Sequence, residues 1–413
     1  MEDGQKKIGL LLTGGGARAG YQVGVLHAVQ QILQDAGHFG GPSPFDIICG
    51  TSAGAINATA LACRADSFED GVAQLMSVWE NFTVDQVYRA DSLGIMRSGA
   101  RWLSILSFGW LLRKWRANPP NSFLDNTPLV SLLHRMLDLP RLDAALASGD
   151  LHALAVTASS YSGGHHITFY QSVAEIAPWR RTQRLSMPAQ IGIEHLLASS
   201  AIPLIFPATP IYCNDHQEYF GDGSMRQIAP ISPAIHLGAD KVLVIGAGRM
   251  AEPAATVTET PTYPSLAQIA GHAMSSIFLD SLAVDIERLT RINQTLSLLP
   301  EEHRNKTPLR PVEMLIIAPS QRLDSIASRH VGSLPISIRT LLGGIGATEA
   351  RGGALASYLL FESSYTCELI RLGQADTLAR RDDVLAFFDV DRRSRRRAPD
   401  QAAEPTLGHI GGE

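Results

Sequence analysis

The sequence is poor in cysteine and has no long apolar run. The apolar stretch after Lys6 and Lys7 ends at Leu12, which is too short for a secretory signal, and no stretch approaches the ~20 residues that span a bilayer. The cysteines form no C-x-x-C pair, and isolated thiols favour a reducing compartment. We therefore expect a cytoplasmic protein without a signal peptide or a transmembrane span. The four cysteines are Cys49, Cys63, Cys213 and Cys367.

Charged residues are also scarce, at 18% of the chain, and the formal net charge is -5. Because a weakly acidic chain lacks the basic surface that binds phosphate backbones, we expect no nucleic-acid partner. An apolar fraction of 45% over 413 residues excludes a disordered chain and is enough for a large core in one or two domains.

The histidines offer no convincing metal site. His165 and His166 are adjacent, and neighbouring residues of a strand point to opposite faces. No clear third ligand stands beside them in the sequence. We interpret this pair as part of a turn and expect neither a metal nor another cofactor.

A serine between two glycines stands at a predicted strand-to-helix turn. The apolar run 45–49 predicts a buried strand, and the small residues 53–58 predict the start of a helix. Ser52, with Gly50 and Gly54 two positions to either side, fits a nucleophile elbow. The alternative is an ordinary tight turn with an N-capping serine.

A second glycine-rich loop follows the first predicted strand, residues 8–13, and precedes a predicted helix over 21–33. Gly14 and Gly16 fit the loose form of a dinucleotide-binding loop, but that site also needs an acidic residue at the end of the second strand, which is missing. In the favoured interpretation, the N–H groups of Gly15 and Gly16 form an oxyanion hole. The order strand, helix, strand, helix predicts a parallel sheet whose carboxyl edge carries both loops.

Asp222 lies between two glycines after a predicted aromatic strand. Asp-Gly is a common hairpin turn, but a tight turn can also hold a carboxylate where it meets Ser52. His236 and His272 follow Asp222 in the order Ser, Asp, His, so an α/β-hydrolase with a histidine base stays an alternative.

The remaining patterns predict further helices and strands in alternation. We expect helices at 66–98, 128–138, 193–200 and 265–297, and strands at 151–157, 166–170, 241–247 and 312–319. We expect three parts in the chain: a catalytic domain over 6–320 with its core motifs in 8–235, a mainly helical C-terminal extension over 321–390, and a basic, disordered tail over 391–413.

Within residues 101–116, the run 102–112 is apolar nearly all round, and cationic residues flank it at 97 and 101 and at 113, 114 and 116. Aromatic and cationic residues around a short apolar segment suit a membrane interface, so we expect peripheral membrane contact. A buried helix with snorkelling cations would give the same pattern. The aromatic residues of this segment are Trp102, Phe108, Trp110 and Trp115.

Four separated motifs together resemble the patatin-like phospholipase family, in its bacterial form. They lie at residues 14–18, 50–54, 198–207 and 222–223, and the resemblance covers about residues 6–250. It implies an α/β fold in three layers, with a mainly parallel central sheet and a C-terminal helical extension. The sequence departs from the family pattern at Ala19 and Ser224, and both changes are small in volume.

The resemblance also implies a chemistry. Ser52 matches the family nucleophile and Asp222 its general base, in a dyad without histidine. Gly14, Gly15 and Gly16, with Arg18, match the oxyanion loop. A serine acyl hydrolase of phospholipid or other acyl-lipid esters is implied. A non-enzymatic lipid-binding or regulatory protein on the same fold is the alternative, and the resemblance implies no oligomeric state.

Overall fold

The computed structural model describes residues 6–38, 40–90, 122–213, 215–250, 263–344, 346 and 353–390. The segment expected to contact membrane, with Trp102, Phe108, Trp110 and Trp115, lies outside the described residues, as does the tail 391–413. All four cysteines are free.

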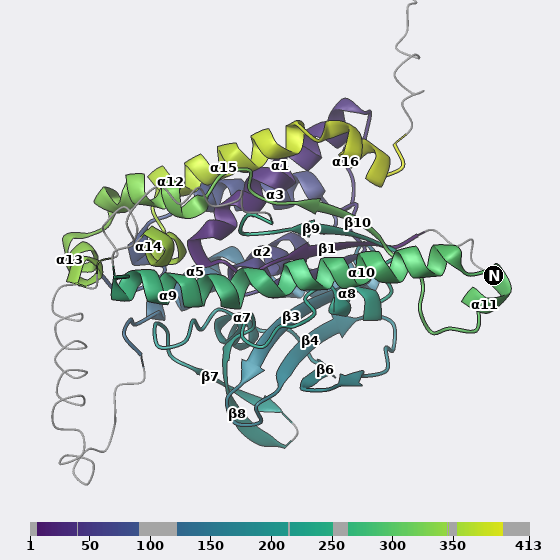
Figure 1. Cartoon of the computed structure of the whole chain (residues 1–413), viewed down its shortest axis with the longest axis horizontal. Coiled ribbons are helices and arrows are strands. Elements are labelled where there is room, and N and C mark those ends of the chain that lie inside the picture. The colour runs from purple at the N-terminus through teal and green to yellow at the C-terminus, as the bar shows by residue number, and fades with distance from the viewer. Residues whose placement is uncertain are drawn as a thin grey trace, which may run out of the picture.

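One ten-stranded sheet runs through the protein in the order β10-β9-β1-β2-β3-β4-β6-β5, with the β7–β8 hairpin joined to β3 (Figure 1). Neighbouring strands from β10 to β3 are all parallel, whereas β4 and β8 are antiparallel to β3. The expected α/β fold with a mainly parallel sheet is confirmed, as a mixed and mostly parallel one. The strands are β1 (Ile8–Leu12), β2 (Ile47–Thr51), β3 (Ala153–Ser160), β4 (His166–Ser172), β5 (Arg180–Arg181), β6 (Arg184–Pro188), β7 (Thr209–Cys213), β8 (His216–Asp222), β9 (Lys241–Ile245) and β10 (Glu313–Ile317).

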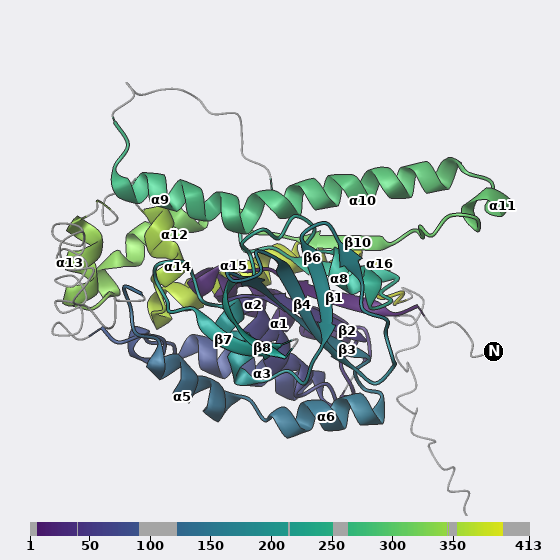
Figure 2. The ribbon, with the colours of Figure 1, turned by 90° about the horizontal axis from the view of Figure 1, so that it is seen from below.

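Helices cover both faces of the sheet, because successive side chains of each parallel strand are buried on opposite faces. Leu10 of β1 packs in a core with α1 (Gly20–Asp35), α2 (Ala53–Ala62) and α3 (Phe68–Glu80). Its neighbour Leu11 packs in a second core with α8 (Ser232–His236) and α10 (Ser281–Leu298). Figure 2 shows α10 along one side of the sheet and α3 on the other. The three-layer arrangement is therefore confirmed.

The other helices connect these layers or form the C-terminal helical region. They are α5 (Thr127–Met136), α6 (Leu139–Ser148), α7 (Ile193–Ser199), α9 (Leu266–Ser275), α11 (Glu301–Arg304), α12 (Leu323–His330), α13 (Ile336–Gly344), α14 (Gly353–Leu359), α15 (Ser363–Leu378) and α16 (Arg381–Phe387). Short 3-10 turns lie at η1 (Gly16–Ala19), η2 (Val84–Gln86) and η4 (Val331–Ser333), and a π-helical turn at η3 (Ser276–Asp280).

The helix expected over 66–98 is much shorter in the structure. The hydroxyl of Ser67 accepts a hydrogen bond from the Asp70 N–H and starts α3, which ends at Glu80. The chain then turns into η2, where the Gln86 side chain accepts from the Thr83 N–H. The prediction was wrong for residues 81–90, because local capping groups start a separate 3-10 turn within an apolar pattern that continues, and residues 91–98 lie outside the described chain.

The long helix expected near 265–297 is present as α9, η3 and α10. Its 33 residues include an 18-residue window with a mean hydropathy of 1.2, so by length and composition alone it could cross a membrane. Leu282 and Leu289 of this helix pack against the sheet. The expected absence of a transmembrane span stays a prediction.

Helix α15, of the C-terminal helical region, lies along α1, although 327 residues separate the end of α1 from the start of α15 (Figure 1). Glycines make this approach possible. A Cβ atom on Gly24 of α1 would lie 2.0 Å from the Ile370 carbonyl oxygen, and one on Gly373 of α15 would lie 2.3 Å from the Tyr21 oxygen. The two helices therefore meet backbone to backbone.

This contact predicts that Gly24→Ala lowers the free energy of unfolding by roughly 1–3 kcal/mol. The new Cβ would meet backbone atoms of α15, which cannot move aside as the end of a flexible side chain can. Urea denaturation measures the change. Gly344→Ala, at the end of α13 with no atom within 4 Å of its new Cβ, is the matched control and should be neutral. Equal stability of the two variants would contradict the close packing of α1 and α15.

Candidate active site

Strand register brings the ends of β2 and β8 together across β3. Thr51 of β2 pairs with Thr157, and the next residue of β3, Ala158, pairs with Asp222. Ser52 follows Thr51 directly. β8 runs antiparallel to β3 and pairs only with its last three residues, so Asp222 lies at the carboxyl edge of the parallel strands, where α/β proteins bind ligands.

Ser52 occupies a strained turn between β2 and α2. Its backbone angles are φ 56° and ψ -131°, which non-glycine residues seldom adopt. The turn is tight enough that a Cβ on Gly50 would lie 2.5 Å from the Ala55 Cα, and one on Gly54 would lie 2.4 Å from the Leu12 oxygen. Both glycines of the expected elbow are therefore required by the close approach of neighbouring backbone.

The hydroxyl of Ser52 donates a hydrogen bond of 2.7 Å to Asp222 Oδ2. Both side chains are almost fully buried, at 1% and 0% exposure. The Ser199 hydroxyl at the end of α7 accepts from the Ser52 N–H at 2.8 Å. The carbonyl of Ala201 accepts from the Asp222 N–H, and that of Ser199 from Gly223, so one short segment holds both ends of the pair.

Burial makes Asp222 a stronger base than a surface aspartate, and no described residue forms an ion pair with its carboxylate. Desolvation raises its pKa to about 6. Hydrogen bonds from the Ser224 N–H to Oδ1 and from the Ser52 hydroxyl act in the opposite direction, because they favour the ionised form. The carboxylate can therefore take up a proton near neutral pH.

The glycine loop lies beside this pair. Parallel pairing of Leu12 with Gly50 puts the loop after β1 next to the elbow after β2, and Gly16 and Ser52 line one cavity. Gly16 begins η1, so its N–H has no acceptor within that helical turn. Within the described part of the chain, no hydrogen-bond acceptor meets the N–H of Gly15 or Gly16. Two backbone donors are thus available near Ser52.

No histidine nitrogen is a hydrogen-bond partner of Ser52 or Asp222 among the described residues. His236 stacks on Trp179 at 4.7 Å between ring centroids, in the core on the α10 side of the sheet. His272 lies on α9. The arrangement thus does not support the alternative with a histidine base, and the described residues contain no cluster of three or more potential metal ligands.

Sequence reasoning missed the groups that hold this site in place. Ser199 lay inside a motif that carried the family resemblance but had no assigned role. His166, at the start of β4, is buried and its Nε2 lies 3.1 Å from the Gly223 carbonyl, beneath the turn that follows Asp222. Desolvation lowers the pKa of His166 to about 4, so the ring is neutral and donates this bond from Nε2.

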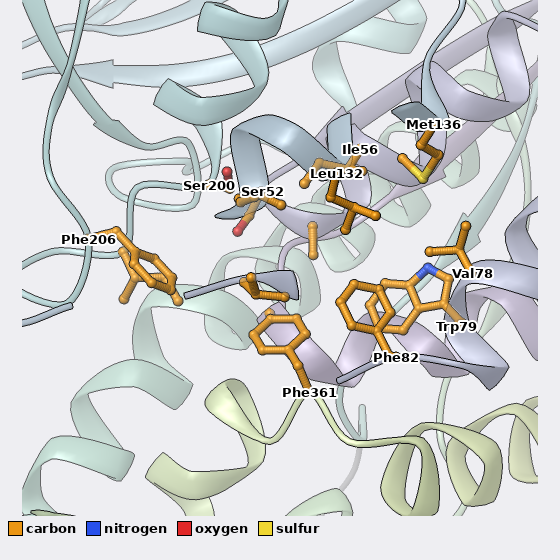
Figure 3. A pocket seen from close by; sticks show the side chains of 15 residues that line it. Ser52, Ile56, Val78, Trp79, Phe82, Leu132, Met136, Ser200, Phe206 and Phe361 are labelled. Carbon is orange, nitrogen blue, oxygen red and sulfur yellow. The ribbon is translucent and has the colours of Figure 1, made fainter. Parts of the chain in front are cut away.

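An apolar cavity opens beside Ser52, and Figure 3 shows its lining. The Ser52 and Ser200 hydroxyls lie at one side of it, and Val78 and Met136 lie at the other. Aromatic rings of Trp79, Phe82, Phe206 and Phe361 form much of the remaining wall. Such a cavity suits a hydrocarbon chain whose polar end stays at Ser52.

Comparison with known proteins identifies a family that shares these motifs. A profile described as patatin-like phospholipase matches residues 10–235, more than half of the 413 residues. Both Ser52 and Asp222 lie within the match. No curated protein sequence matches the chain.

Three solved structures resemble this fold at low identity. VipD from Legionella pneumophila is 13% identical with a TM-score of 0.27, over 89% of this chain and 67% of that chain. Human GIVD cytosolic phospholipase A2, solved with a methyl gamma-linolenyl fluorophosphonate inhibitor and terbium chloride, is 13% identical with a TM-score of 0.41, over 95% of this chain and 60% of that one. The type III effector ExoU is 14% identical with a TM-score of 0.26, over 94% and 90%. At these values the likeness carries no argument about chemistry.

The raised pKa of Asp222 predicts a pH-dependent stability. Between about pH 4 and pH 6 the folded state binds a proton that the unfolded state releases, so the free energy of unfolding falls as pH rises. Asp222→Asn has no carboxyl group at this position, so its stability should not fall with pH for this reason. Its free energy of unfolding relative to wild type should therefore increase by roughly 1–3 kcal/mol between about pH 4 and pH 7.

Denaturant unfolding at several pH values measures this difference. Ser52→Ala keeps the buried carboxylate but loses a hydrogen bond that favours its ionised form, so its stability should also fall with pH and continue to fall above pH 6. Ser77→Ala, at an exposed serine of α3, is the control and should keep the wild-type slope. A pH-independent difference between Asp222→Asn and wild type would show that Asp222 titrates normally.

Proposed function

Because the chain belongs to the patatin-like phospholipase family, we propose that it is a serine acyl hydrolase in which Ser52 and Asp222 form a catalytic dyad. Membership in this family implies a hydrolase of lipid metabolism that acts on acyl lipids. The observation that carries the finer proposal is the buried 2.7 Å hydrogen bond between the Ser52 hydroxyl and Asp222 Oδ2.

In the first half of the reaction, Ser52 Oγ attacks the carbonyl carbon of the lipid ester. The hydroxyl proton passes to Asp222 Oδ2, which already accepts a hydrogen bond from it. The tetrahedral intermediate then collapses, the bond to the leaving alcohol breaks, and Asp222 returns the proton to that alcohol. An acyl ester on Ser52 remains.

In the second half, water attacks the acyl carbonyl and gives its proton to Asp222. The bond to Ser52 Oγ breaks, the fatty acid leaves, and the proton returns to Ser52. A pKa of about 6 suits both tasks, because the carboxylate is ionised at neutral pH yet basic enough to take a proton transiently.

The N–H groups of Gly15 and Gly16 are proposed to stabilise the oxyanion in both halves. They belong to a loop that shares the cavity with Ser52 and have no protein acceptor in the described chain. Preorganised donors of this kind are worth about 3 kcal/mol each at the barrier. Gly14 and Arg18 complete the proposed oxyanion loop.

The apolar cavity is proposed to hold the acyl chain, with the ester at Ser52. Contact with a phospholipid surface, through the segment that contains Trp102 and Trp110, is part of the same proposal and stays a prediction. So does the cytoplasmic location, at the membrane periphery.

Ser52→Ala and Asp222→Asn should each lower kcat/KM for lipid esters by about 10³-fold or more.

In the wild-type protein, kcat/KM should rise with pH through about 6 and then level off, because only ionised Asp222 accepts the proton. Hydrolysis of a phospholipid panel and of a soluble ester measures both. Ser77→Ala, an exposed serine of α3, and the two alanine variants at His236 and His272 should keep wild-type activity.

Full hydrolysis by Ser52→Ala would contradict the proposal. An inactive wild-type protein that still binds lipid would favour a non-enzymatic lipid-binding protein, and loss of activity in a histidine variant would favour a triad.

The cavity predicts that its far wall limits the length of the acyl chain that the protein accepts. Val78→Phe places a ring on the side of the cavity away from Ser52 (Figure 3). We expect kcat/KM for a palmitoyl ester to fall about tenfold or more, since overpacking an apolar pocket is costly, while a butyryl ester is hydrolysed as before. Val173→Phe, on the exposed surface, is the control. An unchanged chain-length preference in Val78→Phe would contradict the assignment of the cavity.

A further inference from the structure

Arg18 of the glycine loop is buried among residues of the C-terminal helical region. Its Nε donates a hydrogen bond of 2.8 Å to the Ser357 hydroxyl. Its guanidinium carbon lies 4.0 Å from the ring centroid of Tyr358, in a cation–π contact. Only 4% of Arg18 is exposed. Both partners belong to α14, far outside the family match that ends at residue 235.

The backbone of α14 touches the same loop. Gly16 has φ +55°, and a Cβ there would lie 2.3 Å from the carbonyl oxygen of Tyr358. The Tyr358 side chain thus contacts Arg18, while its main chain packs on Gly16. Gly16 is the first residue of η1 and Arg18 the third, so both contacts lie next to the N–H groups of Gly15 and Gly16, the proposed oxyanion donors.

Neighbouring elements fix Tyr358 in turn. Its ring stacks on Phe278 of η3 with centroids 4.9 Å apart. The Tyr88 hydroxyl donates to the Leu359 carbonyl at 2.9 Å. Phe361, two residues further, lines the cavity beside Ser52. The Phe278 ring and the Tyr88 hydroxyl therefore hold this segment beside the site.

The charge of Arg18 also acts on an acidic residue of this region. Burial raises the pKa of Asp324 on α12, but its hydrogen bond with Arg322 and the charges of Arg322 and Arg18 outweigh burial, and the pKa falls below its usual value. The contacts with Ser357 and Tyr358 direct the guanidinium toward the C-terminal helices. A guanidinium engaged on this side is not free to bind a lipid phosphate at Ser52.

We propose that Ser357 and Tyr358 are positioning residues of the active site, which clamp Arg18 and so hold the N–H groups of Gly15 and Gly16 toward the reacting carbonyl. This inference rests on the proposed hydrolase function for its kinetic consequence. It makes the C-terminal helical region a structural part of the oxyanion hole, and it gives Arg18 a role in the fold of the loop instead of in binding substrate.

This clamp, the contact of Tyr358 and Ser357 with Arg18, is tested by removing the Tyr358 ring and the Arg18 cation, separately and together. Tyr358→Leu and Arg18→Gln should each lower kcat for a soluble short-chain ester about tenfold or more, with KM nearly unchanged, because misplaced donors are felt mainly in the transition state. The double variant should lose little more than Arg18→Gln alone, since that change already breaks the contacts of Arg18 with both Ser357 and Tyr358. Tyr358→Phe keeps the ring and should behave as wild type, because the buried Tyr358 hydroxyl has no partner among the described residues.

Two further measurements separate positioning from general damage. Leu369→Ala, in the buried core of α15, should lower the melting temperature but leave kcat per folded molecule unchanged. Amide hydrogen exchange should become faster at residues 14–18 in Tyr358→Leu, without a matching change at residues 50–54. This exchange readout does not depend on activity, so it tests the clamp even if the wild-type protein hydrolyses no ester.

The inference would be overturned by a Tyr358→Leu protein with wild-type kcat and unchanged exchange at residues 14–18, or by additive losses in the double variant. An inactive wild-type protein with faster loop exchange in Tyr358→Leu would instead overturn the hydrolase proposal and keep the clamp.

Discussion

The site depends on a carboxylate that is kept in the protein interior and that has no ion-pair partner among the described residues. Asp222 is fully buried, and its hydrogen-bond partners in the described chain are the Ser52 hydroxyl and the Ser224 N–H, both neutral. Burial of a charge is costly, and here the cost appears as a raised pKa. In the proposed reaction, the raised pKa is what lets Asp222 take the proton of the Ser52 hydroxyl directly, without a histidine between them.

The rest of the fold supplies the rigidity that this arrangement needs. Ser52 keeps unfavourable backbone angles because β2, α2 and the Ser199 hydroxyl fix the turn on both sides. Asp222 is fixed by pairing of β8 with β3 and by the Ala201 carbonyl. Beyond the family match, α14 packs on the glycine loop, and α15 packs on the helix that follows it. Contacts from segments far apart in the sequence therefore keep Ser52 in its strained conformation and Asp222 beside it.

Much of this could be predicted from the sequence because its signals are local. Glycines around Ser52 and at residues 14–16 mark turns after apolar strands, and parallel strands bring such turns to one edge. The partners Ser199, His166 and Tyr358 could not be predicted, because each acts through a contact with a segment far away in sequence and none has a local signature. The end of α3 was missed for the opposite reason, since a capping group overrode a continuing apolar pattern. The domain boundaries and the membrane-contact segment stay predictions.

Ser52 is proposed to be a nucleophile that a buried aspartate activates. Labelling with a fluorophosphonate probe, followed by peptide mass spectrometry at a series of pH values, tests it most directly. The account predicts one covalent adduct, on Ser52, whose rate of formation rises through about pH 6 and is nearly abolished in Asp222→Asn. Labelling of another residue, or equally fast labelling of Ser52 in Asp222→Asn, would contradict it.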